Sequence, residues 1–572
     1  MADGGFLAVG FTSAFLPTAS DQDNIKALAR TGGLPSDSGM PHLQIIVSTT
    51  PAELERYDAE IRKLHSEEHQ RNTLHISRLT RERKALASYA AYCRSILSPI
   101  RKLPNELIVD IFELCFPASL YEISHTASME EEMGRISHAY LLNLAHVCSH
   151  WYRIAMETPK LWSTITVDME SELWYRSNNR VNTALGALNF SLMRGKDYPL
   201  NLNACVTSGI IPLSICGLLL RHIRRWKKVY FSSNRPPPWP ASASLDQLVS
   251  LDFDVDAWDH VGTFRKAPRL TELTFSGNIE EIPMLPWAQL KNITYDSLGA
   301  TTTTNAAYSA LSVLRLATNV HECTLYLDFR EDPGHEAWDL QHVASPVKAL
   351  YIELSTEDSD VTGQLFQSIT LPSLDSLRLY PADDATPPVW SAGDFVAMAE
   401  RSGFDTHLTY LRIEVIVTDV DLLRCLRALD QLEVLDVTEY MYIPPDDAHW
   451  QATVTITDKF LQALIIVAPG ASESNLSASA LPKLRSIYLC SVLDFSDASF
   501  VDMLASRREA DGHGGSGEKF KAKLEWFTAR RRDVASETLE EIGQLVSKGG
   551  LVFNSGEREP AIQHGDVVED GV

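Results

Sequence analysis

The 572-residue sequence lacks several short patterns that mark known classes of protein. It contains no Cys-x-x-Cys pair, and its eight cysteines stand mostly in apolar runs, so we expect reduced core residues. It has no Gly-x-Ser-x-Gly elbow, and the glycine-rich stretch over 511–520 has neither the spacing nor the Lys-Ser/Thr ending of a phosphate-binding loop. No enzyme active site is visible, and we expect no catalytic residue, no metal and no cofactor.

The sequence also has little that would direct it into a membrane. No Lys or Arg precedes Lys26, so the basic region of a secretory signal is missing and we expect an intracellular protein, cytoplasmic or nuclear. The longest apolar stretch, over 209–220, is too short to span a bilayer and contains Pro212. The formal net charge of −24 argues against nucleic acid as a partner, because a phosphate backbone needs a basic surface.

One motif carries a metal-binding pattern. The stretch HSEEH over 65–69 matches His-x-x-Glu-His, in which two histidines bind zinc and the glutamate activates water. It lies in a basic, coiled-coil-like segment with no obvious third ligand, so we expect a solvated helix face. An enzyme hypothesis would require a metal at His65 and His69.

The first hundred residues divide into two parts. Residues 1–48 are rich in Gly, Pro, Ser and Thr without a sustained period, which predicts disorder. Residues 49–98 are basic and have no internal Pro or Gly after Pro51, which predicts one long helix and a candidate coiled coil. Pairing with another helix and a solitary helix both remain open. The apolar seam, whose register shifts midway, consists of Leu54, Tyr57, Ile61, Leu64, Leu79, Leu86 and Cys93.

Residues 103–117, LPNELIVDIFELCFP, predict a short apolar helix. Pro104 suits the first helical position, Glu106 favours the first turn, and Pro117 ends the run. Each buried Leu, Ile or Phe contributes about 1.5 to 3 kcal/mol, so this face must be covered by the chain or by a partner. The apolar positions are Leu103, Leu107, Ile108, Ile111, Phe112, Leu114 and Cys115.

A second apolar helix is predicted after an irregular insert over 118–138. Leu141, Leu144, Cys148, Trp151 and Ala155 follow at spacings of three or four residues, and the helix ends before Pro159. Leu161 and Trp162 come directly after a turn, where a Trp can cap the bundle that both helices make. These pieces predict a compact helical module.

Together these residues resemble the F-box pattern: Leu-Pro-x-Glu-Leu, an Ile-Phe pair, Val-Cys-x-x-Trp and a closing Leu-Trp. The preceding long helix and the later phrases DYPLNLNA, HIRRWKKVYF and DKFLQAL resemble fungal F-box proteins. The resemblance implies that residues 99–170 bind the Skp-family adaptor of an SCF-type cullin-RING ubiquitin ligase, and that the chain accelerates ubiquitin transfer by proximity. It implies adaptor contacts by Leu103, Pro104, Leu107, Ile108, Ile111 and Phe112, and an F-box core of Val147, Cys148, Trp151, Leu161 and Trp162.

Residues 171–556 show an irregular repeat. Ten segments, from Trp226 to Leu489, fit apolar-x-x-apolar-x-apolar, and their starts lie 22, 22, 20, 30, 27, 27, 34, 24 and 52 residues apart. Most spacings are near the range of leucine-rich repeats, about 20 to 29 residues. We expect one long repeat, with a helix at TDKFLQALII, across the gap of 52. We therefore predict an α+β multi-domain chain that ends in a leucine-rich-repeat-like α/β solenoid, followed by a disordered tail over 557–572.

The repeat geometry predicts a target-binding face. Marked apolar residues point into the core, and residues between them project from the other face of each strand. The proposed set is Arg378, Tyr410, Arg412, Arg485 and Tyr488. The rival hypothesis is a repeat-domain interaction scaffold without ligase assembly, and an adaptor pulldown distinguishes the two.

Overall fold

The computed structural model describes residues 17–33, 35–36, 39–66, 72–115, 139–168, 178–205, 212–233, 243–255, 261–277, 285–297, 303–329, 341–356, 360–382, 387–443, 451–452, 454–466, 480–511, 519–527, 534–558 and 561–562. The chain divides into two units, Met1–Leu218 and Leu219–Val572. The insert over 118–138 and most of the glycine-rich stretch over 511–520 lie outside the described residues, as does His69.

Three helices begin the first unit: α1 (Ala19–Thr31), α2 (Gly39–Ser66) and α3 (Asn72–Ile96). The structure differs here from the expectation of disorder before residue 49. The reason is a capping box at the start of α1, where the Thr18 hydroxyl accepts from the Asp21 amide at 3.1 Å and the Asp21 carboxylate accepts from the Thr18 amide at 3.0 Å. The three helices bury a shared apolar cluster of Ala29, Leu43, Ile46, Tyr89, Cys93 and Ile96.

The single helix predicted over 49–98 is two helices that pack against each other. Helix α2 also begins before Pro51, which lies inside it. The predicted seam is used within the chain: Tyr57, Leu79 and Leu86 are buried together, and Leu54, Ile61 and Leu64 pack against them. Local periodicity identified the seam, but it could not say that α3 is the partner of α2.

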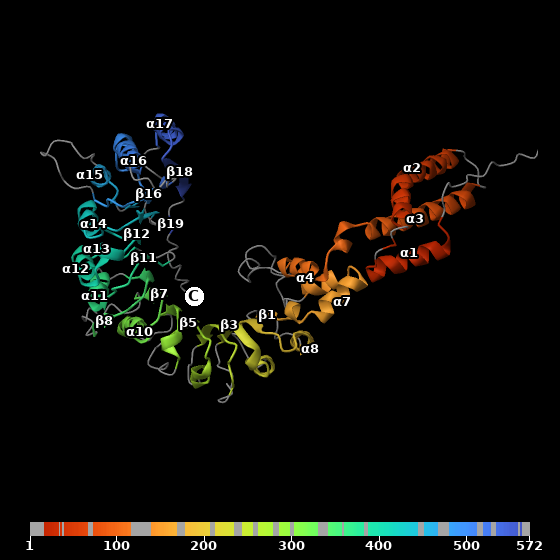
Figure 1. Ribbon diagram of the computed structural model, residues 1–572, viewed down its shortest axis with the longest axis horizontal. Coiled ribbons are helices and arrows are strands. Elements are labelled where there is room, and N and C mark those ends of the chain that lie inside the picture. Colours follow the sequence, from red (N-terminus) through yellow and green to blue (C-terminus); the bar gives the residue numbers. More distant parts are fainter. Residues whose placement is uncertain are drawn as a thin grey trace, which may run out of the picture. The chain divides into compact units, whose positions relative to one another are not determined.

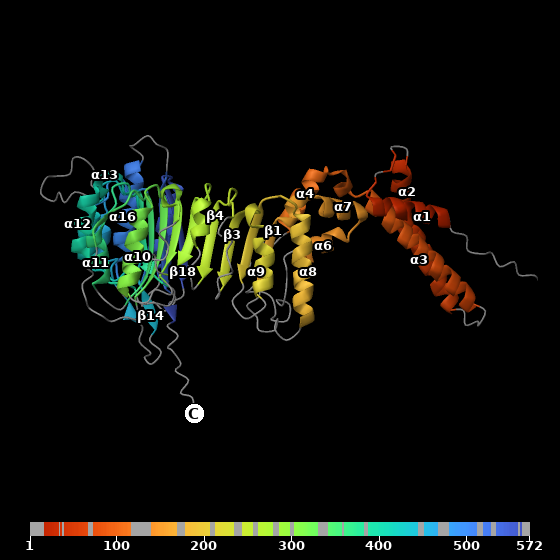
Figure 2. The ribbon, with the colours of Figure 1, turned by 90° about the horizontal axis from the view of Figure 1, so that it is seen from below.

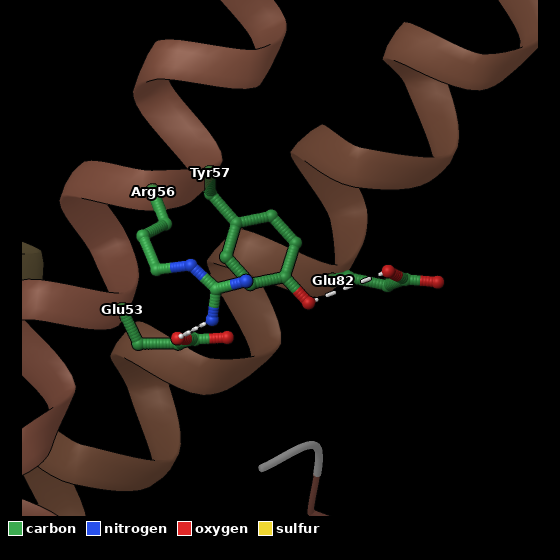
Figure 3. A network of polar contacts seen from close by, with 4 residues as sticks. All are labelled: Glu53, Arg56, Tyr57 and Glu82. Carbon is green, nitrogen blue, oxygen red and sulfur yellow. Dashed lines mark hydrogen bonds and ion pairs between the residues drawn. The ribbon is translucent and has the colours of Figure 1, made fainter. Parts of the chain in front are cut away.

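Polar contacts border this α2–α3 seam (Figure 3). The Tyr57 hydroxyl donates to a Glu82 carboxylate oxygen at 3.4 Å, and Arg56 pairs with Glu53 at 2.7 Å. Exposed ion pairs contribute at most about 1 kcal/mol, so the apolar seam holds the helices together.

The rest of the first unit is built from short elements. In chain order they are η1 (Pro99–Lys102), α4 (Asn105–Leu114), α6 (Ala139–Ala145), α7 (Ser149–Glu157), η2 (Pro159–Trp162), β1 (Thr164–Asp168), α8 (Asn178–Arg194) and β2 (Leu200–Cys205). Strands β1 and β2 pair in parallel. Helix α9 (Pro212–Leu220) follows.

Parallel strands dominate the second unit (Figures 1 and 2). Each main strand pairs in parallel with the strand before it and the strand after it in this series. The series is β3 (Trp226–Ser233), β4 (Ser250–Val255), β5 (Glu272–Ser276), β6 (Asn292–Asp296), β7 (Glu322–Asp328), β9 (Ala349–Ser355), β11 (Ser376–Pro381), β12 (Tyr410–Glu414), β13 (Val434–Thr438), β16 (Ser486–Ser491), β17 (Phe520–Phe527) and β18 (Leu551–Arg558).

Helices line one side of this sheet, as Figure 1 shows for α10 to α17. The side chains alternate accordingly: Leu377 and Leu379 are buried, whereas Arg378 between them is half-buried on the opposite face. The helices are η4 (Ile223–Arg225), η5 (Val261–Lys266), η7 (Trp287–Gln289), α10 (Thr303–Leu316), α11 (Val361–Ser368), α12 (Ala392–Ser402), α13 (Phe404–His407), α14 (Asp419–Leu426), α15 (Asp458–Ala463), α16 (Asp497–Asp511) and α17 (Ser536–Ser547).

Two small sheets complete the second unit. Strand β8 (Val343–Ala344) pairs with β10 (Ile369–Thr370), and β14 (Met441–Ile443) pairs with β15 (Gln451–Ala452) and β19 (Ala561–Ile562). Strand β18, which runs to Arg558, and β19 lie partly or wholly in the tail that was predicted to be disordered; residues 563–572 lie outside the described part.

All ten predicted repeat segments form parallel strands of the sheet. The gap of 52 residues is one long connection, because β13 pairs directly with β16 and the predicted helix is α15. A parallel sheet built strand by strand in chain order is compatible with a solenoid.

Candidate partner-binding site

The module formed by α4, α6, α7 and η2 has its own apolar core. Phe112 meets Trp151 edge to face at 5.1 Å between ring centroids, and the Trp162 indole donates to the Ala155 carbonyl at 2.6 Å. Trp162 therefore closes the bundle, as predicted, with its polar group satisfied. The buried residues are Ile108, Phe112, Leu141, Ala145, Ile154, Ala155, Met156, Leu161 and Trp162, with Leu103, Val109, Leu144 and Trp151 packed against them.

Helix α4 has one face in this core and another face outside it. Ile108 and Phe112 are fully buried, so these two predicted adaptor contacts serve the core instead. Leu107 is 48% exposed and Leu114 is 85% exposed, and Ile111 between them is half-buried. Residues 107, 111 and 114 recur at helical spacing, so they form one outward stripe. Leu114 was in the predicted apolar run but not among the predicted contacts.

The start of α4 is also shifted from the prediction. Pro104 is the N-cap rather than the first helical residue, and its side chain is exposed. The Ile108 amide donates to the Pro104 carbonyl at 3.2 Å, which begins the helix. Leu103 packs against the core, so it is only partly available to a partner.

The second predicted helix is interrupted, which moves Val147 out of the core. Helix α6 ends at Ala145, and Cys148 caps α7 by accepting the Trp151 amide hydrogen at its Sγ, 3.4 Å away. Val147 precedes this cap and is 62% exposed, so its assignment to the F-box core is wrong. Cys148 is half-buried, whereas Leu161 and Trp162 are core residues as predicted.

Helix α1 docks on this module, a contact that sequence reasoning missed. Arg101 Nη2 donates to the Ala29 carbonyl at 2.7 Å, and the Ser149 hydroxyl donates to the Arg30 carbonyl. Gly32 ends α1 with a φ of 77°, and a side-chain carbon there would collide with His150.

Charged groups surround the module. Lys160 pairs with Glu113 at 2.9 Å, which links η2 to α4. Burial lowers the pKa of His150 below its usual value, and the guanidinium groups of Arg153 and Arg101 act in the same direction. His150 therefore favours its neutral form beside α1.

Four of the five predicted target-binding residues, on β11, β12 and β16, occupy the sheet face opposite the helices. Arg378, Arg412 and Tyr488 belong to one row across β11, β12, β13 and β16, in which Asp436 stands between Arg412 and Tyr488. Tyr410 is two residues from Arg412 on β12 and approaches Arg378, whose guanidinium carbon lies 4.9 Å from its ring centroid. Arg485 stands just before β16, where it is exposed and lies 3.9 Å from Glu433.

The zinc-like motif has only one member in the described part of the chain. His65 is exposed near the end of α2. Across the described ranges, no group of three or more His, Cys, Asp or Glu residues could hold a metal ion.

Comparison with known proteins identifies the helical module. A family model described as F-box-like matches residues 100–168, which span η1 to β1. These residues are an F-box-like domain. A search of curated proteins finds no match to the chain. None of the helices that the structure describes is long and apolar enough to pass through a bilayer.

Proposed function

We propose that this chain is the substrate-recognition subunit of an SCF-type cullin-RING ubiquitin ligase. In this proposal the chain is an F-box protein of the fungal type. Its F-box-like domain binds a Skp-family adaptor. Its second unit is a leucine-rich-repeat-like solenoid that binds a target protein. The match over residues 100–168 is the observation that carries the proposal. In this proposal the chain supplies no catalytic group, and the assembly works in the cytoplasm or nucleus.

The exposed apolar stripe of α4 supports adaptor binding. Leu107 and Leu114 have no place in the core of the domain, and covering them stabilises a complex without disturbing the fold. Buried apolar anchors in an interface commonly contribute about 2 kcal/mol, which is roughly 30-fold in Kd.

The double change Leu107→Glu and Leu114→Glu tests this role. We expect purified adaptor to bind the variant at least about 30-fold more weakly in calorimetry or a pulldown, with an unchanged circular dichroism spectrum. Leu74→Glu is the matched control, because Leu74 on α3 is 84% exposed and Leu114 is 85% exposed. Unchanged adaptor binding by the double variant would show that the α4 stripe is not part of the interface. Absence of adaptor binding by the wild type would contradict the ligase assignment.

A further inference from the structure

A row of side chains on the helix-free face of the sheet contains an arginine that has no hydrogen-bond or ion-pair partner among the residues that the structure describes. The row, called here the arginine row, crosses β9 to β16 and consists of Tyr351, Arg378, Arg412, Asp436 and Tyr488. Its members stand on successive strands, which lie about 4.8 Å apart.

Arg378 is held between two aromatic rings. Its guanidinium carbon lies 4.6 Å from the Tyr351 ring centroid and 4.9 Å from that of Tyr410. Such stacking fixes the plane of a guanidinium without using its hydrogen-bond donors. Arg378 forms no hydrogen bond or ion pair with any residue in the described part of the chain, and its Nε is buried without an acceptor. This Nε therefore has a donor to offer to a ligand. The Nε of Arg412 is likewise buried without an acceptor, so the two arginines differ in ion pairing.

The neighbouring arginine is different, because its charge is already matched. Arg412 lies 3.6 Å from Asp436 and 5.6 Å from the ring centroid of Tyr380. Burial raises the pKa of Asp436, and Arg412 opposes that rise most, with smaller effects of Lys523 and Arg378 in the same direction. In the arginine row the charge left over is therefore the single positive charge of Arg378.

The next register row is acidic and aromatic. Glu353 stands between Tyr326 and Tyr380 in the pairing of β7, β9 and β11, and Glu414 follows on β12. Glu414 pairs with Arg558 at 3.8 Å, and Glu353 adds a negative charge beside the arginine row. A ligand with one negative charge balances Arg378, whereas a phosphate, with about two charges at neutral pH, would also be opposed by Glu353.

We propose that this face binds an acidic segment of the target protein, with one Asp or Glu carboxylate of that segment accepting hydrogen bonds from Arg378. A carboxylate matches the fork of a guanidinium, and charge-assisted pairs of this kind are among the stronger hydrogen bonds. The tyrosines around Arg378 supply the apolar contact area that is typical of interface centres. The inference rests on the proposed function, in which this unit binds the target.

In the experiment, a library of displayed random 12-residue peptides is selected for binding to the full-length protein. The Kd of each selected peptide is then measured by fluorescence anisotropy. We expect acidic peptides to be enriched. Replacing the critical Glu of a selected peptide by Gln should weaken binding at least about tenfold, and Arg378→Met should cause a similar loss. In the Arg378→Met protein the Gln peptide should bind no worse than the Glu peptide, because the two changes remove the same pair.

Controls separate this site from general effects. Arg424→Met, at an exposed arginine on helix α14 and outside the predicted target-binding set, should leave the peptide affinity unchanged, and Arg378→Gln serves if Arg378→Met does not fold. The proposal is overturned if selection enriches no acidic peptide, if neither Arg378 variant weakens binding, or if a phosphoserine form of the peptide binds more tightly than the Glu form. Adaptor binding is measured on the same protein. If the wild-type protein binds acidic peptides but no adaptor, the ligase assignment is contradicted. If it binds the adaptor but no acidic peptide, the carboxylate site is contradicted.

Discussion

Arg507 on α16 is a charged residue whose side chain is fully buried. Its guanidinium donates to three backbone carbonyls: Leu464 at 2.8 Å, Leu481 at 2.7 Å and Ala480 at 3.0 Å. Leu481 has a φ of 61°, a region that a leucine seldom adopts. Arg507 thus holds two points within the long connection between β13 and β16, one at Leu464 and one at Ala480 and Leu481.

Replacing Arg507 by Met should lower the free energy of unfolding by about 3 kcal/mol or more, because three buried carbonyls lose their donors. Lys should not restore it, since one ammonium group cannot reproduce the guanidinium geometry. Urea unfolding checks the change. Arg424→Met, at an exposed arginine on α14, is the control and should alter stability by no more than about 0.5 kcal/mol. Equal effects at both positions would contradict this role of Arg507.

At the scale of elements, His150 on α7 lies beside Gly32 at the end of α1, and the neutral form of its imidazole is favoured. Because the folded pKa of this imidazole is lowered, folding favours the unprotonated ring. The resulting stabilisation is fully present above the unfolded pKa of about 6.5, and it is lost as the pH falls through the folded pKa.

We therefore expect α1 to loosen below about pH 6.5, while the F-box-like core stays folded. Amide hydrogen exchange of residues 19–31 should quicken on lowering the pH from 7.5 to 5.5 by more than the intrinsic rate change predicts. In His150→Gln, which cannot take up a proton, this additional pH effect should be absent. Identical pH dependence in the two proteins would show that His150 does not control the contact.

The sequence predicted elements whose pattern is local and missed those defined by their partners. The ten repeat strands were found because alternating burial leaves its period in each short segment. Strand β18 was missed because its residues are mostly exposed at the edge of the sheet, and it is specified by pairing with β17. Helix α1 had a readable signal in Thr18 and Asp21, which composition alone concealed.

For the candidate partner-binding site, the sequence likewise predicted the helix but not which of its residues are buried. The apolar run over 103–117 indicated the right helix, but both its core residues and its exposed residues are apolar, so the sequence could not divide them. The break at Cys148 also escaped the pattern, since Leu141, Leu144, Cys148, Trp151 and Ala155 keep helical spacing through it.

On the scale of the second unit, one ion pair joins strands that are far apart in the sheet order. Arg558 on β18 lies 3.8 Å from Glu414 on β12, although β13, β16 and β17 stand between them. Burial raises the pKa of Glu414, and Arg558 opposes that rise. Because the folded pKa is raised, the contribution of Glu414 to stability is favourable below the unfolded pKa of about 4.3 and is lost as the pH rises through the folded pKa.

Arg558→Met should lower the melting temperature more at pH 8 than at pH 4, because an ionised Glu414 then lacks its partner. We expect a cost of about 1 kcal/mol at pH 8, since Arg558 is partly exposed. The same change in a Glu414→Gln protein should cost much less, which a double-mutant cycle measures. Additive effects of the two substitutions would show that the pair contributes nothing.

The strictly sequential order of the main strands has a mechanical consequence. Tension on the carboxyl terminus would first load the pairing of β19 with β14 and the Arg558–Glu414 ion pair. The main strands pair in sequential order, so the β17–β18 pairing would be loaded next and the layers would then detach one after another. The strands that carry Arg378 and its tyrosines lie well inside this series. A force–extension curve should accordingly show a series of small unfolding events. A target segment bound at the arginine row should stay bound while the outermost strands unfold.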